Sequence, residues 1–346
     1  MEMQQYSMDL YWKEIFSGIC PALSFKHSNL NFEEWAEAAR NKLMELMGEF
    51  PEKTSLDAEI LSTESCELFE RRKVVFKSER DMAVPCYVLI PYRTKEKQKL
   101  PAILCSHGHG KYGKEPVAGI KNQKKFRDEI EKMNYNYGEQ LAKEGFVTLV
   151  PDLRGFGERK AGYEEWKECE VCNFNYMRGS LIKKYPLSMN VWDMKRCIDY
   201  LESMPEVDPS RIGMMGLSLG GTMTTFTSAL DKRIRAADIV GYINPIFEFG
   251  IRHKNMCGSQ VVPGLYQYFD TYDIAGMIAP RPLLIEMGKK DECFLIEDME
   301  KGFQEVAVIY HAAAADHRLQ KDVHEGGHAF SGKKAADFFR KYLCEN

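Results

Sequence analysis

Five short apolar runs, separated by stretches of helical periodicity, constrain the fold of this chain more than any other feature. Each run is apolar on both faces and therefore predicts a strand that is buried from both sides. Buried strands that alternate with helices indicate a mostly parallel sheet covered by helices, so we expect a three-layer α/β sandwich. The runs are PAILCSH (101–107), GFVTLVPD (145–152), RIGMMGLS (211–218), AADIVGYI (236–243) and RPLLIEMG (281–288). The helical stretches between them are YGEQLAKEG, SMNVWDMKRCIDYLESM and LGGTMTTFTSAL.

The chain before the first run shows two other patterns. A helix is predicted after Asn31, which forms a capping pair with Glu34, and Gly48 is its predicted end. Its apolar residues recur at steps of three and four and share one face: Phe32, Trp35, Ala39, Leu43 and Leu46. From about Cys66 the runs ELFERRKVVFKS and VPCYVLIPY predict an antiparallel pair of strands. We expect a helical extension over residues 1–60, packed on a larger α/β domain over residues 61–346.

The segment MMGLSLGGTMT, residues 214–224, contains a G-x-S-x-G motif between a predicted strand and a predicted helix. A serine on so tight a turn has strained backbone geometry, and Gly216 and Gly220 are the tiny neighbours that such a turn requires. Its hydroxyl projects from the sheet edge, and the helix N-terminus faces any negative charge that develops there. We therefore predict that Ser218 is a nucleophile and that the amide of Leu219 is an oxyanion donor.

A serine nucleophile needs a base, and the base needs a carboxylate that orients it. Asp291 lies three residues beyond Gly288, in a loop after a predicted strand. His328 follows two glycines in VHEGGHAF, after the probable strand RLQKDV. We predict that Asp291 is the acid and His328 the base.

Each of these assignments has a rival. Glu292 adjoins Asp291 and is the alternative acid, and Asp291 could also be a plain surface carboxylate. His324 competes with His328 but lies inside the predicted strand, where a structural role is expected. Asn244 occupies the other position at which an acid is expected and cannot carry the charge.

The loop after the first apolar run reads SHGHGKYG, and its small residues permit a sharp bend. We predict that the amide of His109 is the second oxyanion donor. For the imidazole of His109, two roles stay open: substrate binding and a structural role. The segment PDLRGFGER contains Asp152 and Arg154, for which we expect an ion pair that shapes the floor of the loop.

Three connections, 108–134, 153–187 and 244–279, are too long for simple turns and are expected to be lids or binding loops. The last is rich in aromatic residues that suit a sugar, an acyl or aryl group, or simple packing: Phe247, Phe249, Tyr266, Tyr268, Phe269 and Tyr272. In the same connection, Arg252, His253 and Lys254 either receive an anionic group or are solvated.

Charge and cysteine usage exclude some classes of function. The chain has 47 basic and 51 acidic residues, so neither nucleic acid nor an anionic membrane is indicated as a partner. The ten cysteines lack the spacing of a disulfide scaffold, and with no secretory signal or spanning segment we expect free thiols in the cytoplasm. Cys169 and Cys172 form CEVC, which could be half of a zinc site or a redox couple. Without a second CxxC or a nearby histidine pair, we expect a structural or incidental role.

The motifs together resemble those of the α/β-hydrolase superfamily, in its dienelactone-hydrolase-like and acetyl-xylan-esterase-like branch. The resemblance covers residues 66–346 and rests on SHGHG, PDLRGFGER, VDPSRIGMMGLSLGG, APRPLLIEMGKKD and HEGGHAF. It implies an eight-stranded sheet, no metal, no organic cofactor, and Ser218, Asp291 and His328 as the triad. The sequence departs from dienelactone hydrolases, which have a cysteine nucleophile, and from ring-forming sugar acetyl esterases, which often have Gln at the position of Leu219.

The resulting hypothesis is a serine hydrolase that cleaves a small-molecule or carbohydrate carboxylic ester, such as a short acyl or acetyl ester, through an acyl-enzyme. A peptidase or amidase on the same triad is the first alternative, although such enzymes commonly add a large propeller or cap domain. A catalytically silent binding protein is the second alternative, although silent relatives usually lose the serine or histidine. The sequence leaves the oligomeric state open.

Overall fold

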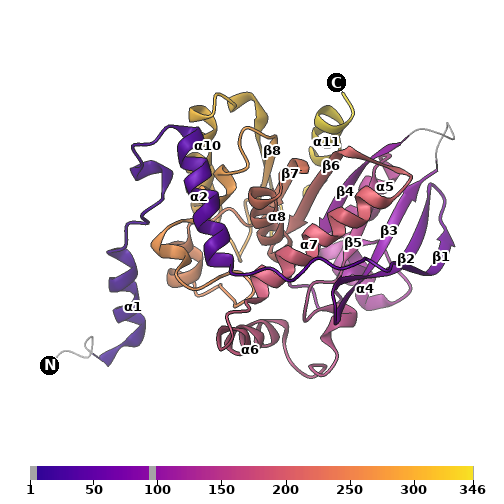
Figure 1. Ribbon diagram of the computed structural model, residues 1–346, viewed down its shortest axis with the longest axis horizontal. Helices are drawn as coiled ribbons and strands as arrows, with labels where there is room; N and C mark the ends of the chain where they lie inside the picture. Colours follow the sequence, from indigo (N-terminus) through magenta and orange to yellow (C-terminus); the bar gives the residue numbers. More distant parts are fainter. Residues whose placement is uncertain (1–5, 93–98, 346) are drawn as a thin grey trace.

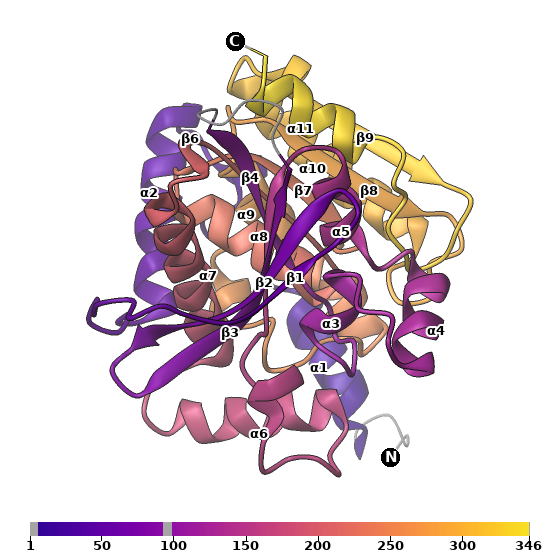
Figure 2. The same cartoon turned by 90° about the vertical axis from the view of Figure 1, so that its right-hand side faces the viewer.

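A nine-stranded sheet between two layers of helices forms the centre of the molecule in the computed structural model, which describes residues 6–92 and 99–345 (Figures 1 and 2). Its strand order is β1-β2-β3-β5-β4-β6-β7-β8-β9. The first four strands of this order pair antiparallel, and all later pairs are parallel. The expected α/β sandwich with an antiparallel start is therefore confirmed. The strands are β1 (Glu59–Ser65), β2 (Phe69–Glu79), β3 (Met82–Pro91), β4 (Leu100–Ser106), β5 (Val147–Pro151), β6 (Val207–Leu217), β7 (Ile234–Val240), β8 (Leu283–Gly288) and β9 (Leu319–His324).

The sheet has one strand more than the eight that we expected, because β1 adds an outer edge beside β2. All seven residues of β1 are exposed, so the strand has no buried face and no apolar alternation by which its sequence could reveal it. Backbone pairing with β2, from Glu59 opposite Val75 to Ser65 opposite Glu70, holds it in place. This strand crosses residue 60, where we placed the boundary of the N-terminal extension.

Two hydrophobic clusters cover the two faces of the sheet. One cluster joins the sheet to α2, α7, α8, α9 and α10, and the other joins it to α3, α5 and α11. Because both faces are covered, the central strands are apolar on both sides, as their sequences predicted. The helices are α1 (Met8–Ser17), α2 (Phe32–Met47), α3 (Lys114–Val117), α4 (Lys124–Met133), α5 (Tyr137–Lys143), α6 (Glu168–Ser180), α7 (Pro186–Ser203), α8 (Leu219–Leu230), α9 (Thr271–Gly276), α10 (Ile296–Ala312) and α11 (Ala335–Leu343).

The predicted N-terminal helix is present as α2. Asn31 and Glu34 form the capping box at its start, and Gly48 ends it with a positive φ of 75°. Trp35 is fully buried in the larger cluster and donates its indole N–H to the carbonyl of Leu23, at 2.8 Å. In Figure 1, α1 projects from the side of the molecule on which α2 lies. Residues 1–5 of the expected extension lie outside the described residues.

The three long connections contain helices that the sequence analysis did not predict. The first contains α3 and α4, the second contains α6, and the third contains α9 together with a π-helical turn at Phe247–Arg252. In α6 only Val171, Cys172 and Gly179 are buried, so this helix shows no apolar stripe in its sequence. None of the described helices combines the length and the apolar character needed to cross a bilayer.

Candidate active site

Ser218 occupies the turn between the last residue of β6 and the first residue of α8. Its backbone angles, φ 63° and ψ −117°, lie outside the regions that a residue with a side chain ordinarily adopts. A Cβ atom on Gly220 would lie 2.1 Å from the carbonyl oxygen of Ser106, and one on Gly216 would lie 2.5 Å from the backbone of Gly220. The turn therefore has the geometry that the G-x-S-x-G spacing predicted, and the two glycines are required by space.

Asp291 and His328 are brought together by the loops that follow β8 and β9. The Oδ2 atom of Asp291 lies 2.7 Å from Nδ1 of His328. Its Oδ1 atom accepts hydrogen bonds from the amides of Cys293 and Phe294, at 2.8 and 2.9 Å, so the buried carboxylate has a fixed orientation. The rival acid, Glu292, is exposed to solvent.

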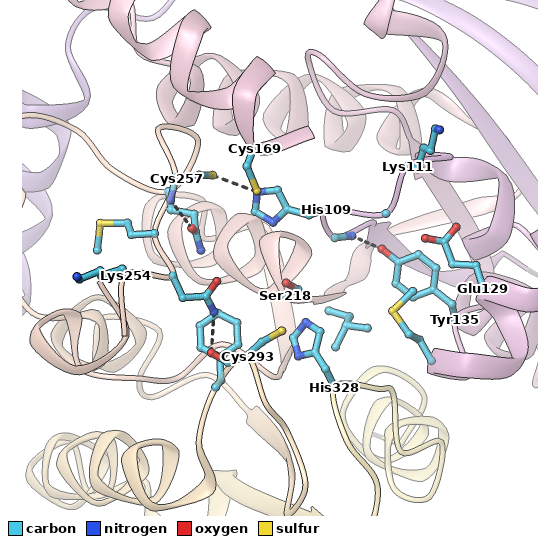
Figure 3. Close-up of a pocket in the computed structure, with 18 of the residues that line it drawn as sticks. His109, Lys111, Glu129, Tyr135, Cys169, Ser218, Lys254, Cys257, Cys293 and His328 are labelled. Carbon is cyan, nitrogen blue, oxygen red and sulfur yellow. Dashed lines mark hydrogen bonds between the residues drawn. The ribbon is translucent and has the colours of Figure 1, made fainter. Parts of the chain in front are cut away.

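The His328 ring and Ser218 both lie at the end of β7. The amide of Ser218 donates to the carbonyl of Val240 at 2.9 Å, and the ring of His328 lies over the next residue, Gly241. A Cβ atom on Gly241 would lie 3.3 Å from that ring, and Phe294 stacks on the ring with centroids 5.6 Å apart. Ser218 and His328 both line one pocket, into which Figure 3 shows their side chains projecting.

The loop after β4 is pressed against the serine turn. A Cβ atom on Gly108 would lie 2.8 Å from the carbonyl oxygen of Leu217 and 3.1 Å from Cβ of Ser218. The amide of Gly108 donates to the hydroxyl of Tyr135, which anchors the residue before His109. Leu219 is the first residue of α8, so its amide has no acceptor within the helix. The two predicted oxyanion donors therefore belong to segments that flank Ser218.

Two other histidines have structural partners. His107 is fully buried, accepts the amide hydrogen of Leu153 at Nε2 over 3.0 Å, and burial lowers its pKa to about 4. The ring of His107 is therefore neutral, and it holds two loops together. His324 lies inside β9, as predicted, and its Nδ1 accepts the amide hydrogen of Gly326 at 3.2 Å.

The pocket has a volume of about 500 Å³. None of the six aromatic residues of the third connection is among the described residues that line the pocket. The aromatic side chains that line it are Tyr135 and Phe294. Phe249 and Phe269 lie in the hydrophobic core instead, so simple packing is the alternative that holds for them. Besides the candidate catalytic residues, the charged and amide side chains of the lining are Lys111, Glu129, Asn173, Lys254, Asn255 and Gln260.

The three basic residues of the third connection have different surroundings. Arg252 pairs with Glu248 at 2.8 Å, and Nε2 of His253 lies 3.2 Å from Asp298. Lys254 alone of the three lines the pocket, where it also pairs with Asp9 of α1 at 3.0 Å.

The floor of the second connection contains two ion-pair groups where we expected one. Arg154 binds the fully buried carboxylate of Asp193 through two hydrogen bonds of 2.8 and 2.7 Å, and Arg159 adds a third of 2.7 Å. Asp152 pairs instead with the buried Lys114 of the first connection, at 2.6 Å. Neither group lines the pocket, so both act on the shape of the loops.

The imidazole of His109 lies close to two cysteines. Its Nε2 lies 3.0 Å from Sγ of Cys257, which belongs to the third connection. Cys172, from the second connection, lies in the same cluster. Sequence reasoning missed Cys257, Tyr135 and Phe294, because no motif spacing signals any of them. Cys257 and Tyr135 lie far from Ser218 along the chain, whereas Phe294 lies only three residues after Asp291.

Comparison with known proteins places the chain among hydrolases. A family model described as the abhydrolase family matches residues 11–322. The putative hydrolase YtaP of Bacillus subtilis (strain 168) is 28% identical over 317 residues, which cover 88% of this chain and 98% of that protein. The acetyl esterase Axe7A of Xylanibacter ruminicola is 30% identical over 223 residues, which cover 58% of this chain and 45% of that enzyme.

Solved structures share the fold at low sequence identity. A putative acetyl xylan esterase of Bacteroides fragilis NCTC 9343 superimposes with a TM-score of 0.76 at 18% identity, covering 97% of this chain and 89% of that one. A glucuronoyl esterase from Solibacter usitatus gives a TM-score of 0.67 at 13% identity, covering 94% and 98% of the two chains. These likenesses extend the shared fold over nearly the whole chain.

Proposed function

The chain belongs to the abhydrolase family, and from that premise we propose that it is a serine hydrolase that cleaves carboxylic esters through an acyl-enzyme. The observation that carries the proposal is the contact between Asp291 and His328 at 2.7 Å, beside a serine with strained backbone geometry in one pocket. An orienting carboxylate, a base and a serine on a tight turn are the three parts that acyl transfer requires.

In the proposed reaction, His328 removes the proton of the Ser218 hydroxyl as its oxygen attacks the ester carbonyl. Asp291 holds the proton of the ring on Nδ1, which leaves Nε2 free as the base, and stabilises the imidazolium that forms. His328 then gives the proton to the departing alcohol. Water activated by the same ring releases the acid and restores Ser218.

The negative oxygen of each tetrahedral intermediate needs hydrogen-bond donors that are in place beforehand. We assign this role to the amides of Leu219 and His109, because both flank Ser218. Removing one such donor typically costs about 3 kcal/mol of transition-state stabilisation. Tyr135 would act as a positioning residue, since its hydroxyl accepts the amide hydrogen of Gly108.

We further propose a polar alcohol portion, such as a carbohydrate, with a short acyl group. The support is the lining of the pocket, where Lys111, Glu129, Asn173 and Gln260 offer donors and acceptors to hydroxyl groups. The names of the relatives, acetyl esterase and acetyl xylan esterase, agree with this assignment.

The test compares the wild type with Ser218→Ala on three substrate classes: p-nitrophenyl acetate, acetylated sugars and peptide p-nitroanilides. We expect hydrolysis of both ester classes by the wild type and its loss in Ser218→Ala. Ser210→Ala is the matched control, because Ser210 is exposed at the opposite end of the same strand. A fluorophosphonate adduct on Ser218 in the wild type would identify the nucleophile independently of the substrate.

Three results would contradict the proposal in different ways. Equal ester turnover by the wild type and Ser218→Ala would remove Ser218 from the mechanism. Cleavage of peptide anilides alone would replace the esterase by the amidase alternative. Absence of both turnover and the covalent adduct would favour the catalytically silent alternative.

A further inference from the structure

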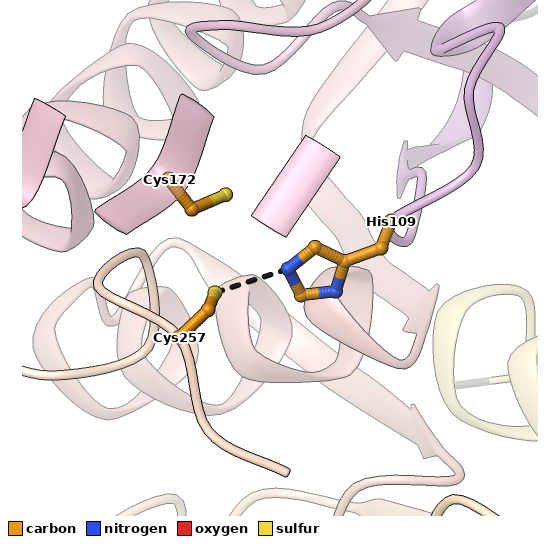
Figure 4. Close-up of side chains that lie close together, drawn as sticks. All are labelled: His109, Cys172 and Cys257. Atoms are coloured by element: carbon orange, nitrogen blue, oxygen red, sulfur yellow. Dashed lines mark hydrogen bonds between the residues drawn. The ribbon is translucent and has the colours of Figure 1, made fainter. Parts of the chain in front are cut away.

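Three metal-ligating side chains meet next to the pocket, and each comes from a different long connection. His109 belongs to the first connection, Cys172 to α6 in the second, and Cys257 to the third. Nε2 of His109 lies 3.0 Å from Sγ of Cys257, and the ligand atoms of all three residues lie within 4.8 Å of one another (Figure 4). We refer to these three side chains as the thiol cluster.

The thiol cluster has the donor types and the spacing of a zinc site. Zinc binds thiolate at about 2.3 Å and imidazole nitrogen at about 2.0–2.1 Å, so neighbouring ligand atoms in a tetrahedral site lie about 3.5–3.8 Å apart. The observed 3.0 Å contact and the upper limit of 4.8 Å bracket that separation. The three ligand atoms are therefore spaced as the ligands of one zinc ion would be.

We propose that the thiol cluster, completed by Cys169, binds one zinc ion and thereby joins the three connections around the pocket. Cys169 and Cys172 are three residues apart in α6, so their side chains lie on neighbouring positions of one face of the helix. Cys169 lines the pocket together with His109 and Cys257. Its ligand atom does not belong to the set that lies within 4.8 Å, so Cys169 must move toward the other three to complete the site. Three cysteines and one histidine are a common ligand set for structural zinc.

The surroundings hold the cysteine of the third connection against α6 without an ion. The amide of Cys257 donates to Oε1 of Gln260 at 3.0 Å, and the amide of Gly258 donates to Oδ1 of Asn173 in α6 at 2.9 Å. A Cβ atom on Gly258 would lie 2.3 Å from Cβ of Tyr176, so only glycine permits this approach. A site whose ligands are held in advance loses less conformational entropy when the ion binds.

Zinc binds cysteine as the thiolate and histidine as the neutral imidazole. Binding to this cluster therefore releases the protons of the three cysteine thiols to solvent.

A disulfide between Cys172 and Cys257 is the competing interpretation of the cluster. It would require an external oxidant and would leave the imidazole of His109 and the thiol of Cys169 without a function. A metal ion uses all four side chains, which is why we favour it. In this proposal the CEVC segment supplies half of the ligands, and the other half comes from residues far away in the sequence.

The experiment measures metal content, so its outcome does not depend on the proposed hydrolysis. The full-length protein is expressed in zinc-supplemented medium, dialysed against metal-free buffer and analysed by elemental mass spectrometry. We expect about one zinc per chain, and a loss of at least about tenfold in Cys172→Ser and Cys257→Ser, because each removes a thiolate. Cys344→Ser is the matched control, because Cys344 is exposed near the C-terminus and lies outside the cluster.

Cobalt substitution guards against loss of zinc through misfolding. The wild-type protein loaded with Co²⁺ should show thiolate-to-cobalt charge-transfer absorption in the near ultraviolet and the visible bands of a tetrahedral site. Circular dichroism of the serine variants shows whether each remains folded. Retention of full zinc by Cys169→Ser would remove Cys169 from the ligand set.

Four results would overturn the zinc site. The first is wild-type protein that contains no zinc and gives no cobalt spectrum. The second is a loss of zinc in Cys344→Ser as large as that in Cys172→Ser and Cys257→Ser. The third is full zinc content in folded Cys172→Ser. The fourth is a Cys172–Cys257 disulfide, found by peptide mapping of protein alkylated at lysis.

Discussion

The carboxylate of Asp291 lies 2.7 Å from Nδ1 of His328 through one oxygen, and its other oxygen accepts the amides of Cys293 and Phe294. The carboxylate is thus fixed by its own loop before it meets the ring. Phe294 belongs to both interactions, because its amide orients Asp291 and its ring stacks on His328. The loop after β8 therefore sets the position and the tautomer of the proposed base.

Asp291→Asn should reduce kcat by on the order of 10⁴-fold, because an amide cannot stabilise the imidazolium and favours the wrong tautomer of His328. Stability should change little, since the Asn carbonyl can still accept the two amides. Steady-state kinetics on p-nitrophenyl acetate, with urea unfolding alongside, test this. Glu292→Gln is the control and should retain activity, because Glu292 is exposed. The reverse ranking of the two variants would assign the acid to Glu292.

Gly220→Ala should destabilise the fold by about 1–3 kcal/mol and reduce activity, since its Cβ atom would lie 2.1 Å from the carbonyl oxygen of Ser106. The backbone of the serine turn must shift to relieve that overlap. Gly18→Ala is the matched control, because its Cβ atom would lie no closer than 3.6 Å to another atom and its φ is −85°. Urea unfolding of both variants measures the difference in their free energy of unfolding. Equal stability of the two would show that the turn adapts without cost.

Asp193→Ala should destabilise the protein by about 3–5 kcal/mol, because Arg154 and Arg159 would lose the buried carboxylate that they share. Asp128→Ala removes an exposed carboxylate that pairs with Lys124 in α4 and should change stability by less than about 0.5 kcal/mol. Chemical denaturation of both variants measures the difference. A small effect at Asp193 would mean that water replaces the carboxylate at the two arginines.

The stability of the protein should fall as the pH rises from about 5 to about 8, and Glu286 should account for part of this. Burial raises the pKa of Glu286 to about 8, and the neighbouring carboxylate of Asp322, which lies opposite Glu286 in the sheet, adds to the shift. The folded protein therefore keeps a proton that the unfolded chain has already lost above about pH 5. Each such proton changes the free energy of unfolding by about 1.4 kcal/mol per pH unit.

Glu286→Gln should accordingly flatten this decline, because the amide stays neutral at every pH in the window. Urea unfolding at pH 5.5 and pH 8.0 gives the slope for the wild type and the variant. Glu37→Gln, an exposed position on α2, should keep the wild-type slope. An unchanged slope in Glu286→Gln would mean that Glu286 is ionised in the folded protein throughout this range.

Local sequence determined the order of the elements and the geometry around Ser218. The central strands carry apolar residues on both faces, and α8 begins and ends at Leu219 and Leu230, as its sequence predicted. These features could be predicted because strand and helix periodicity, capping and tight turns depend on residues close in sequence. The positions of Asp291 and His328 followed from the same information, since the carboxyl ends of parallel strands share one edge of the sheet.

Tertiary structure alone decided what lies around that edge. The exposed strand β1 has no periodicity of its own and exists through its pairing with β2. The aromatic residues of the third connection pack into the core, whereas Tyr135 and Phe294 reach the pocket. The contact of His109 with Cys257 joins residues 148 positions apart. Such contacts depend on how long connections fold over the sheet, and the spacing of residues along the chain holds no information about that path.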